Sequence, residues 1–477
     1  MTTVHPPLPL YEAVAQEIAN LVRDGTLRPG ERIPSVRRLS VQKRVSISTV
    51  LQAYSVLENT GVIEARPQSG YYVRAKRERP LEPALSSPSA AATFVGVNAL
   101  VERTLVARKR SGIVPLGEAC PSPELLPTAK LRRLLASVSA RHAVSLTAYA
   151  FPPGNEKLRR QIARHALDGG CNLHGDDIIV TNGCMEALNL CLRAVAKAGD
   201  TIALESPTYF GLLQIIESLG MKALEIPTHP RDGISIEALE LATRKRGVKA
   251  CVVMANVGNP LGSVMPDERK RRLVALLAER DIPLIEDDVY GDLYYGAARP
   301  RTAKAFDRAG MVLLCSSFTK ALAPGFRVGW VAPGRFRAQV EMVKFINSVA
   351  TPEILQLTLA EFLESGGYER HLRALRRTFA QQVQRTSAAI FDYFPAGTRV
   401  TRPQGGFVLW VELPPRCDAL RLHREALAEN IGLMPGPMFS AAKNAYRNCL
   451  RLSCGYPWSN RIDQALLRLG ELAKQQG

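Results

Sequence analysis

The sequence predicts an α/β protein with a small N-terminal head, a linker, and a large body built on a mostly parallel sheet. Three observations lead to this prediction. The first 75 residues combine apolar positions at helical spacing with two short strand-like runs. A stretch rich in Pro, Ser, Ala and charge follows, and beyond it apolar strand-like runs alternate with helical patterns. The expected parts are the head at 1–75, the linker at 76–110, the body at 111–477, its large domain at about 145–345, and a smaller α+β lobe mainly at 346–477.

The head is predicted to hold three helices and a β-hairpin. Apolar residues repeat at helical spacing over 10–24, which predicts a first amphipathic helix. Ser35 can cap a second short helix, and a third is expected over 47–60. Two short strands, 62–65 and 71–73, flank a turn with Pro and Gly and form the hairpin. Three helices and a hairpin in this order form a winged helix-turn-helix.

The linker and body follow from a change in composition. Residues 76–97 carry the pattern of a flexible linker, which is expected to pass into a helix near 98–109. The runs that we expect to be strands are Ile178–Thr181, Thr201–Leu204, Ala250–Met254, Pro283–Ile285 and Val312–Cys315 in the large domain, and Gly406–Val411 and Leu450–Leu452 in the smaller lobe. Strands that alternate with helices predict a mostly parallel sheet covered by helices.

Length, charge and cysteine content restrict the class of protein. A chain of 477 residues suits two or three domains. The formal net charge of +18 favours an anionic partner, although it is spread along the whole chain. Nine cysteines without Cys-x-x-Cys spacing indicate buried thiols, and no metal site is expected. The N-terminus lacks the pattern of a secretory signal, and no apolar run reaches the ~20 residues that a membrane span needs. These features predict a cytoplasmic protein without a membrane segment.

The third helix of the head is the expected DNA-reading element. A helix-turn-helix places its second helix in the major groove, and polar residues at the start of that helix face phosphates and base edges. Nearby arginines add positive charge, and the hairpin can approach the minor groove. The candidate DNA-binding residues are Ser35, Arg37, Arg44, Ser46, Ser48, Thr49, Arg66 and Gly70. The alternative is that these are ordinary solvated polar residues in a small protein-interaction domain.

The pattern of the head as a whole argues against that alternative. The segments Gly25–Leu39, Val45–Val50 and Gly61–Gly70 closely resemble the GntR family of winged-helix repressors. The resemblance covers residues 9–74 and implies binding to double-stranded DNA. The head departs from the family pattern at Ile47, where Arg is frequent, and at Gln68, where Gly is frequent in the wing.

A second constellation of residues lies in the body. One apolar strand ends in Asp287-Asp288-Val289-Tyr290, and the next ends in Ser316-Ser317-Phe318-Thr319-Lys320, with Arg327 shortly after. Many pyridoxal 5'-phosphate (PLP) enzymes hold their cofactor in this way. A lone lysine is ordinarily a solvated charge. Lys320 differs because of these partner residues, and burial at a strand end can lower the pKa of its amine and free it to form a Schiff base.

The other requirements of PLP have candidates of their own. Asp287 can face the pyridine nitrogen, while Tyr290 and Asn259 can reach the phenolic oxygen. A strand–Gly–helix turn can bind the phosphate with its amides, and Tyr209 can stack on the ring, its alternative being a core or turn tyrosine. The candidate cofactor-binding residues are Asn182, Gly183, Cys184, Met185, Tyr209, Asn259, Asp287, Tyr290, Ser317, Lys320 and Arg327.

These segments, taken together and in this order, resemble the fold-type I aminotransferases from about residue 115 to the C-terminus. Two more residues carry over from the resemblance. Tyr149 matches the tyrosine that reaches the phosphate in the neighbouring subunit, and Arg451 matches the arginine that binds a substrate α-carboxylate. From the residues alone, Arg451 could instead be a surface ion-pair partner, although carboxylate binding is favoured. Cys184 and Met185 depart from the small residue and the Gln that are common at their positions.

A GntR-type head, a linker and an aminotransferase-like body resemble the MocR-type regulators. This resemblance implies a head-to-tail homodimer that binds an operator and senses PLP, or its adduct with an amino acid or amine effector, at Lys320. An active aminotransferase with a vestigial head is the alternative, and a sensor of PLP that takes no amino acid is a third. The sequence does not distinguish a catalyst from a sensor, because both need the same Schiff base. Nor does it reveal the operator, the target genes, the effector, or whether the protein activates or represses.

Overall fold

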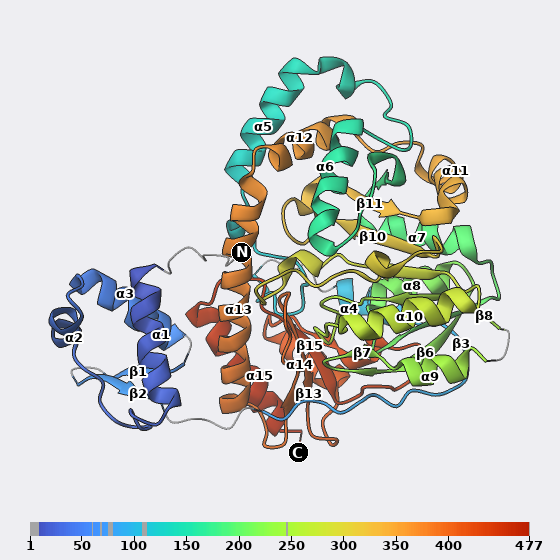
Figure 1. The fold of residues 1–477 in the computed structure, drawn as a ribbon. Coiled ribbons are helices and arrows are strands. Elements are labelled where there is room, and N and C mark those ends of the chain that lie inside the picture. The colour runs from blue at the N-terminus through green and yellow to red at the C-terminus, as the bar shows by residue number, and fades with distance from the viewer. Residues whose placement is uncertain are drawn as a thin grey trace. The chain divides into compact units, whose positions relative to one another are not determined.

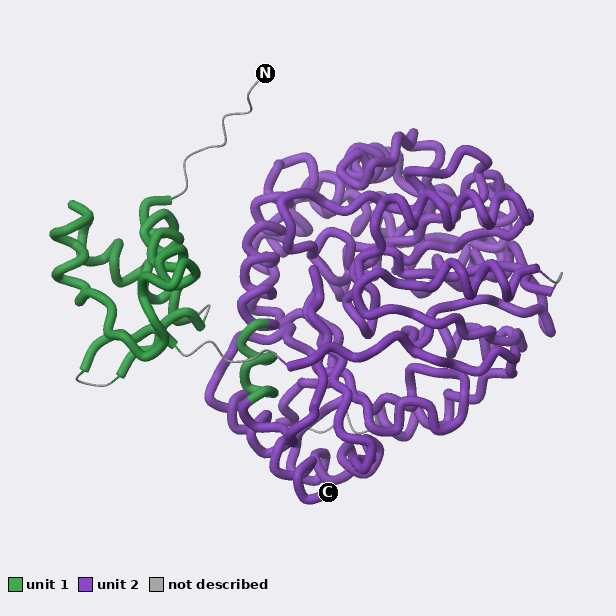
Figure 2. The backbone as a smooth tube through the Cα atoms, turned by 60° about the horizontal axis from the view of Figure 1, so that its bottom comes forward, with its two compact units in different colours: residues 1–79, 384–391 green, residues 80–383, 392–477 purple. Residues whose placement is uncertain are grey.

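The structure, a computed structural model, describes residues 9–59, 61–66, 69–74, 80–106, 112–244 and 247–476. The chain divides into two compact units (Figure 2). The first contains residues 1–79 with 384–391, and the second contains residues 80–383 with 392–477. Each unit is described by itself below. No helix within the described ranges combines the length and the apolar character that crossing a membrane requires.

The head has the predicted elements in the predicted order. They are α1 (Leu10–Arg23), α2 (Val36–Lys43), α3 (Ile47–Asn59), β1 (Ile63–Arg66) and β2 (Gly70–Val73). The two strands pair antiparallel, and Ala53, Tyr54 and Leu57 of α3 are buried in a core shared with α1. The Ser35 side chain accepts a hydrogen bond from the Arg38 N–H, which confirms it as the cap of α2. The winged helix-turn-helix prediction is therefore confirmed.

The body is built on a mostly parallel sheet, as predicted. In the described chain, its strands lie in the order β3-β6-β5-β8-β9-β10-β11-β4, with β7 paired to β6. The strands from β6 to β10 in this order run parallel to one another, and the outer pairings are antiparallel. The bounds are β3 (Thr93–Phe94), β4 (Ile179–Thr181), β5 (Thr201–Ser206), β6 (Lys222–His229), β7 (Gly233–Ile234), β8 (Val248–Val253), β9 (Leu284–Asp287), β10 (Val312–Ser317) and β11 (Gly329–Ala332).

Helices cover both faces of this sheet (Figure 1). Helices α7 and α8 contribute to one apolar core, and α9 and α10 contribute to the other. Successive residues of β9 face opposite cores, Leu284 on the side of α10 and Ile285 on the side of α7. The helices of the body are α4 (Asn98–Val106), α5 (Thr128–Arg141), α6 (Glu156–Ala166), α7 (Cys184–Val195), α8 (Phe210–Ser218), α9 (Ile236–Ala242), α10 (Asp267–Glu279), α11 (Arg337–Ser348), α12 (Glu353–Glu364), α13 (Gly367–Tyr393), α14 (Ala419–Ala428) and α15 (Asn460–Lys474).

The smaller lobe has its own sheet, in the order β12-β13-β15-β14. Its strands are β12 (Arg399–Val400), β13 (Val408–Glu412), β14 (Met434–Pro435) and β15 (Cys449–Ser453), all paired antiparallel. The two predicted strands of the lobe correspond to β13 and β15. The nine cysteines are free thiols, and all but Cys120 are buried, which confirms the expectation for them.

Within the linker predicted for 76–110, the flexible stretch expected over 76–97 is wrong for residues 80–97, whereas α4 confirms the helix expected near 98–109. Residues 80–106, here called the arm, belong to the second unit. Strand β3 extends the large sheet beside β6, and Val95, Val97 and Val101 are buried in the core that includes α8. The cluster of Pro, Ser and Ala residues at the start of the segment predicted a linker and concealed these few apolar anchors. Residues 75–79 and 107–111 lie outside the described ranges.

Candidate functional site

The start of α3 presents the hydroxyl groups expected of a reading helix. The Ser46 hydroxyl accepts a hydrogen bond from the Thr49 N–H (3.1 Å) and lies 2.8 Å from the Ser48 hydroxyl and 2.7 Å from that of Thr49. Ser46 therefore caps the helix, and Ser46 and Ser48 are both exposed. Ile47, beside them, is 49% exposed although it is apolar, which suits a contact surface.

The basic residues of the head differ in how far they are already engaged. Arg37 and Arg44 are exposed, and Arg44 has the left-handed conformation that ends α2 (φ 54°). Arg66 on β1 instead contacts the Glu64 carboxylate at 2.9 Å and lies over the Tyr72 ring, 4.4 Å from its centroid. To contact DNA, the Arg66 guanidinium must therefore break its ion pair with Glu64 or bind both groups at once.

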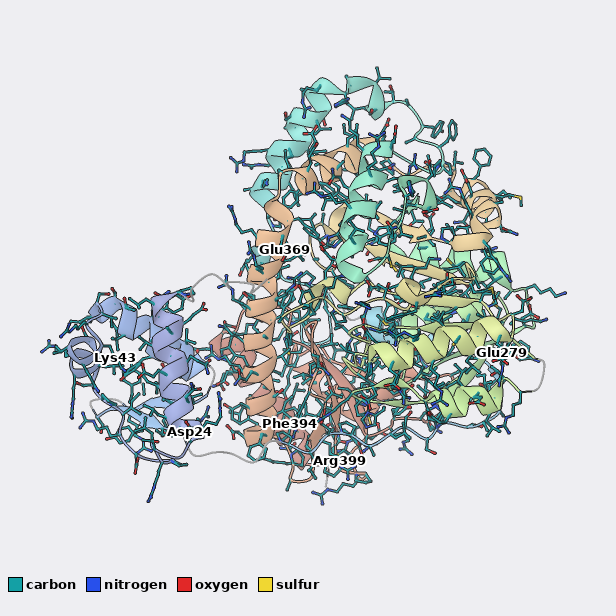
Figure 3. All side chains as sticks on the ribbon, viewed as in Figure 1. Asp24, Lys43, Glu279, Glu369, Phe394 and Arg399 are labelled. Atoms are coloured by element: carbon teal, nitrogen blue, oxygen red, sulfur yellow. The ribbon has the colours of Figure 1, made fainter. Side chains whose placement is uncertain are left out.

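Lys43, Gly70 and Arg32 make further contacts in the head. Lys43, labelled in Figure 3, forms an ion pair with Glu17. A side chain at Gly70 (φ 109°) would approach the Arg32 guanidinium to 3.3 Å, so Gly70 lets Arg32 pack at the base of the wing. The sequence pattern did not single out Arg32, because its role depends on pairing with the hairpin. Gln68, where the family pattern is broken, lies outside the described residues.

In the body, Lys320 lies just beyond the end of β10, beside the buried ring of Tyr290. Its Nζ donates a hydrogen bond to the Ala119 carbonyl (2.6 Å) and is 5.7 Å from the centroid of the Tyr290 ring. Burial lowers the pKa of Lys320 to about 8, and the positive charge of Arg451 acts in the same direction. The amine is thus neutral in a large fraction of molecules near pH 8, as a nucleophile requires.

This pKa leads to a pH-dependent prediction. A lysine at its ordinary pKa of 10.5 is almost fully protonated at pH 8, whereas Lys320, with its pKa lowered to about 8, is about half neutral there. The rate of covalent PLP uptake should therefore rise with pH and level off above about pH 8. Stopped-flow absorbance across pH 6–11 measures this rate. A midpoint near 10.5 would contradict the assigned environment of the lysine.

Asp287 and Asp288 point to opposite faces of the sheet, as alternation along a strand requires. Asp287 accepts hydrogen bonds from the Cys184 thiol (3.4 Å) and the Val289 N–H (3.1 Å), and burial raises its pKa to about 6. Asp288 accepts from the Asn256 amide (3.0 Å) and pairs with the Arg299 guanidinium. The acid on the side of Lys320 is therefore Asp287, and Asp288 points elsewhere, as predicted.

The turn between β4 and α7 forms a cradle around a guanidinium. Gly183 has φ 86°, and a side chain there would strike the guanidinium of Arg327. Gly329 is equally constrained, because its own Cβ would lie 2.8 Å from the Cα of Gly183. The first N–H groups of α7, at Cys184 and Met185, have no acceptor within their own helix. The arginine and these amides can together bind an anion.

Asn182, also expected to face the phosphate, is engaged elsewhere. Its backbone N–H donates to the Glu186 carboxylate (2.6 Å), and its side-chain amide donates to the other oxygen of that carboxylate (3.2 Å). Glu186 in turn accepts from the Lys344 ammonium (2.8 Å). In the structure, the hydrogen bonds from Asn182 to the Glu186 carboxylate therefore hold the turn in place. Ser317 is buried, and its hydroxyl accepts from the Thr319 N–H (3.3 Å).

Asn259 and Arg451, 192 residues apart in the chain, meet in the body. Arg451 is 1% exposed, and its guanidinium donates to the Asn259 side-chain oxygen (3.2 Å) and to the Gly117 carbonyl (2.7 Å). Tyr209 lies close enough to Tyr290 to raise the pKa of the Tyr290 hydroxyl further, although burial is the main cause. These contacts bring the ring-binding and carboxylate-binding candidates into one region.

Tyr149 stands apart from this region within one chain. It is 72% exposed, its ring centroid lies 5.6 Å from that of Phe151, and the Phe151 ring lies 6.1 Å from that of Phe345. Exposed aromatic residues of this kind are suited to a protein–protein contact.

The residues present fit PLP. The hydroxyl of Tyr290 is fully buried and has no hydrogen-bond partner among the described residues, which leaves it available to an oxygen on the cofactor ring. Gly183 leaves room for Arg327 at the anion-binding turn. Asp287, which is buried, and Lys320, which is partly buried, supply the carboxylate and the amine that the ring requires.

The sequence patterns did not single out residues 117–119, which contact Arg451 and Lys320. The backbone carbonyls of Gly117 and Ala119 accept from Arg451 and Lys320, and no side-chain pattern marks a backbone acceptor. Glu186 follows Asn182 by four residues, a spacing that places both on one side of the helix start. This spacing could have predicted the contact between Asn182 and Glu186.

Known proteins share both parts of this architecture. Residues 116–469 match the aminotransferase class I and II family, and residues 10–73 match the gntR family of bacterial regulatory proteins. The HTH-type transcriptional regulators YjiR and YdcR of Escherichia coli are 41% and 39% identical to the chain, covering 97% and 98% of it and 98% and 99% of their own lengths. The alpha-aminoadipate aminotransferase LysN of Thermus thermophilus, solved with N-(5'-phosphopyridoxyl)-L-leucine, has a TM-score of 0.73 at 28% identity, covering 79% of this chain and 94% of its own.

The chain belongs to the aminotransferase class I and II family and, with its GntR-type head, has the architecture of the MocR-type regulators.

Proposed function

We propose that the protein is a DNA-binding transcriptional regulator that senses PLP, or an adduct of PLP with an amino compound, at Lys320. One observation carries the proposal: a lysine of lowered pKa, a buried acid and an unpartnered buried tyrosine converge in a chain that also carries a winged helix-turn-helix. The names of the relatives YjiR and YdcR support the regulatory part.

The residues around Lys320 have separate tasks. When bound, PLP supplies an electron-withdrawing ring that reacts with amines. The neutral amine of Lys320 would hold the cofactor covalently, and Asp287 would keep a proton on the pyridine nitrogen, because its own pKa of about 6 leaves it ionised at neutral pH. Tyr290 would donate to the phenolic oxygen, and the turn at Gly183 with Arg327 would bind the phosphate.

An amino acid effector would bind through its carboxylate. Arg451 is buried, and its planar guanidinium suits bidentate binding of a carboxylate. The contact of Arg451 with Asn259 holds the guanidinium on the side of the site where that effector would lie. The second subunit of a head-to-tail homodimer would contribute Tyr149, whose exposure in the single chain supports this role.

The arm offers a route from the body towards the head. Glu82 contacts Arg231 of the large domain at 2.6 Å and Arg402 of the smaller lobe at 4.0 Å. The Leu81 carbonyl accepts from the Val400 N–H (2.9 Å), also in the smaller lobe. Movement of the lobe against the large domain therefore changes the contacts of the arm, which continues towards the head. This is the linkage that a ligand-controlled regulator requires.

Exchanging Glu82 for Gln should weaken the coupling between PLP binding and operator binding. The exchange removes the charge shared by two arginines and leaves the residues around Lys320 unchanged. We expect PLP binding and basal operator binding to persist, while the change in operator affinity caused by PLP falls by about half or more. Fluorescence anisotropy with labelled operator DNA, recorded with and without PLP, measures the basal operator affinity and its change. Glu279→Gln, at the exposed end of α10 (Figure 3), is the matched control. An unaltered PLP response in Glu82→Gln would exclude this route.

The second candidate is a working aminotransferase with a vestigial head. The contact between Arg451 and Asn259 favours it, since a buried carboxylate-binding pair is also what a catalyst needs. Steady production of a second amino acid from an amino donor and a keto acid would support the enzyme. Selection of genomic DNA fragments on the purified protein tests the regulator. A discrete, reproducible site is expected, whereas weak, salt-sensitive and sequence-independent binding would contradict the proposal.

A further inference from the structure

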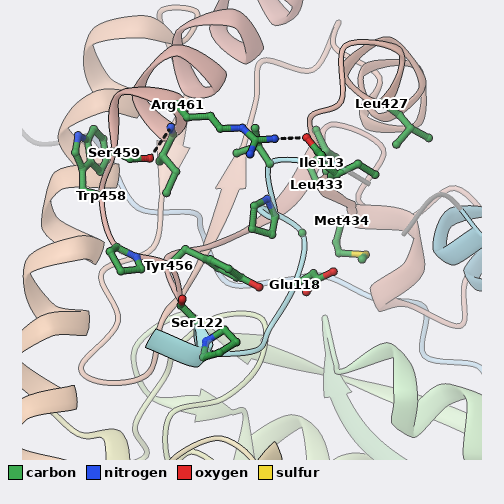
Figure 4. Close-up of a pocket in the computed structure, with 18 of the residues that line it drawn as sticks. Ile113, Glu118, Ser122, Leu427, Leu433, Met434, Tyr456, Trp458, Ser459 and Arg461 are labelled. Atoms are coloured by element: carbon green, nitrogen blue, oxygen red, sulfur yellow. Dashed lines mark hydrogen bonds between the residues drawn. The ribbon is translucent and has the colours of Figure 1, made fainter. Parts of the chain in front are cut away.

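A cavity of about 660 Å³ lies in the body (Figure 4). Its walls come from residues 112–124, from the end of α14 with the turn into β14, and from residues 456–462. Among the described residues that line it are none of the cofactor-binding candidates and not Arg451. The cavity therefore adjoins the site described above at Gly117, whose carbonyl accepts from Arg451, without including the side chains of that site, and its volume suits a small organic molecule.

Two acceptors stand out among the polar groups of the cavity, which also include the hydroxyls of Ser122, Tyr456 and Ser459. His423 is 8% exposed, and its Nδ1 has no hydrogen-bond partner among the described residues. Burial lowers the pKa of this ring, so it is neutral at pH 7, and its contact with the Leu433 backbone favours the proton on the other nitrogen. Glu118 lines the same cavity, and Figure 4 shows the Tyr456 hydroxyl directed towards it. A carboxylate and an imidazole acceptor select a ligand with a positively charged N–H donor.

The remaining lining is largely apolar. Leu427, Leu433, Met434 and the Trp458 ring form walls of the cavity. Aromatic rings attract cations as well as apolar groups. Arg461 also lines the cavity, but its guanidinium donates to the Gly112 carbonyl. The combination favours an amine cation attached to an apolar body.

The wall that carries Glu118 also touches the cofactor site. The Gly117 carbonyl accepts from Arg451 (2.7 Å), and the Ala119 carbonyl accepts from Lys320 (2.6 Å). Glu118 stands between these two residues in the chain. A ligand that pulls on its carboxylate therefore acts directly on the two backbone acceptors that hold the reactive lysine and the carboxylate-binding arginine.

We propose that this cavity is a second ligand site, which binds an organic amine cation with an apolar body between Glu118 and His423. Its occupant shifts the Gly117–Ala119 backbone and so changes the reactivity of Lys320. The binding site does not depend on the proposed regulatory function.

N,N-dimethyl-2-phenylethylamine is the probe of choice, because a tertiary amine cannot form a Schiff base with PLP. Calorimetric titration of the full, PLP-loaded chain should show saturable binding, which Glu118→Gln weakens about tenfold or more. Glu102→Gln, on the exposed side of α4, is the matched control and should bind as the wild type does. The neutral amide N,N-dimethyl-2-phenylacetamide should bind about tenfold more weakly than the amine to the unaltered protein, which tests the charge requirement without a variant.

Three results would overturn the proposal. They are the absence of saturable binding to the wild type, equal affinity for amine and amide, and binding that is unaffected by Glu118→Gln but lost in Arg451→Lys. The last of these would place the probe in the cofactor site. A probe-induced shift in the pH midpoint of PLP uptake, present in the wild type and absent in Glu118→Gln, would support the coupling to Lys320.

Discussion

Replacing Lys320 with alanine should abolish the visible absorbance band that PLP gains when it is joined to a lysine. The variant loses the amine that the fold places beside Asp287 and Tyr290, and with it the covalent attachment. Asp287, Tyr290 and the anion-binding turn remain, so PLP still binds without a covalent bond. Its retention after desalting should fall about tenfold or more.

Absorbance spectra of desalted protein, taken after incubation with excess PLP, measure this effect. Lys197→Ala, which removes an exposed lysine after α7, is the matched control and should keep the band. A band of normal intensity in Lys320→Ala would show that another lysine carries the cofactor, and the assignment of the site would then be wrong.

The joint exchange of Arg37 and Ser48 for alanine should strongly weaken specific operator binding. Arg37 is exposed at the start of α2, and Ser48 presents an exposed hydroxyl at the start of α3. A base contact contributes about 1–3 kcal/mol, and a phosphate contact about one unit of the salt slope. Together these losses should weaken operator binding by about 100-fold.

Gel-shift titrations at several salt concentrations measure the affinity and the salt slope. PLP binding should be unchanged, because both residues lie in the head. Arg23→Ala, at the exposed end of α1, is the matched control. Operator affinity within about twofold of wild type in the double variant would show that the surface of α2 and α3 does not read the DNA.

Much of the fold could be predicted because local patterns and tertiary packing agree. The cap at Ser35 and the apolar spacing along α3 were sufficient to predict the helices of the head. Asp287, the last residue of β9, and Asp288, the residue after it, likewise have different contacts, since neighbouring residues of an extended chain point to opposite sides. The aspartate that serves the candidate site follows from the end of the strand and its partner lysine, 33 residues later.

The errors arose where a few contacts override composition or a general motif. The arm has the composition of a linker, but Val95 and Val97 anchor it to the core. Asn182 lies in the expected turn, but the Glu186 carboxylate binds its backbone N–H. The carbonyl of Ala119, which holds Lys320, has no signature in the sequence, because every residue carries the same acceptor. Such partners can be found only when distant segments are placed together.

The most direct test of the central claim is the operator affinity of the full chain, measured with and without PLP, in the wild type and in Lys320→Ala. The account predicts that PLP changes the affinity of the wild type by about fivefold or more, and leaves that of Lys320→Ala unaltered. An equal response in both proteins, or no response in the wild type, would contradict the claim that Lys320 couples the cofactor to DNA binding.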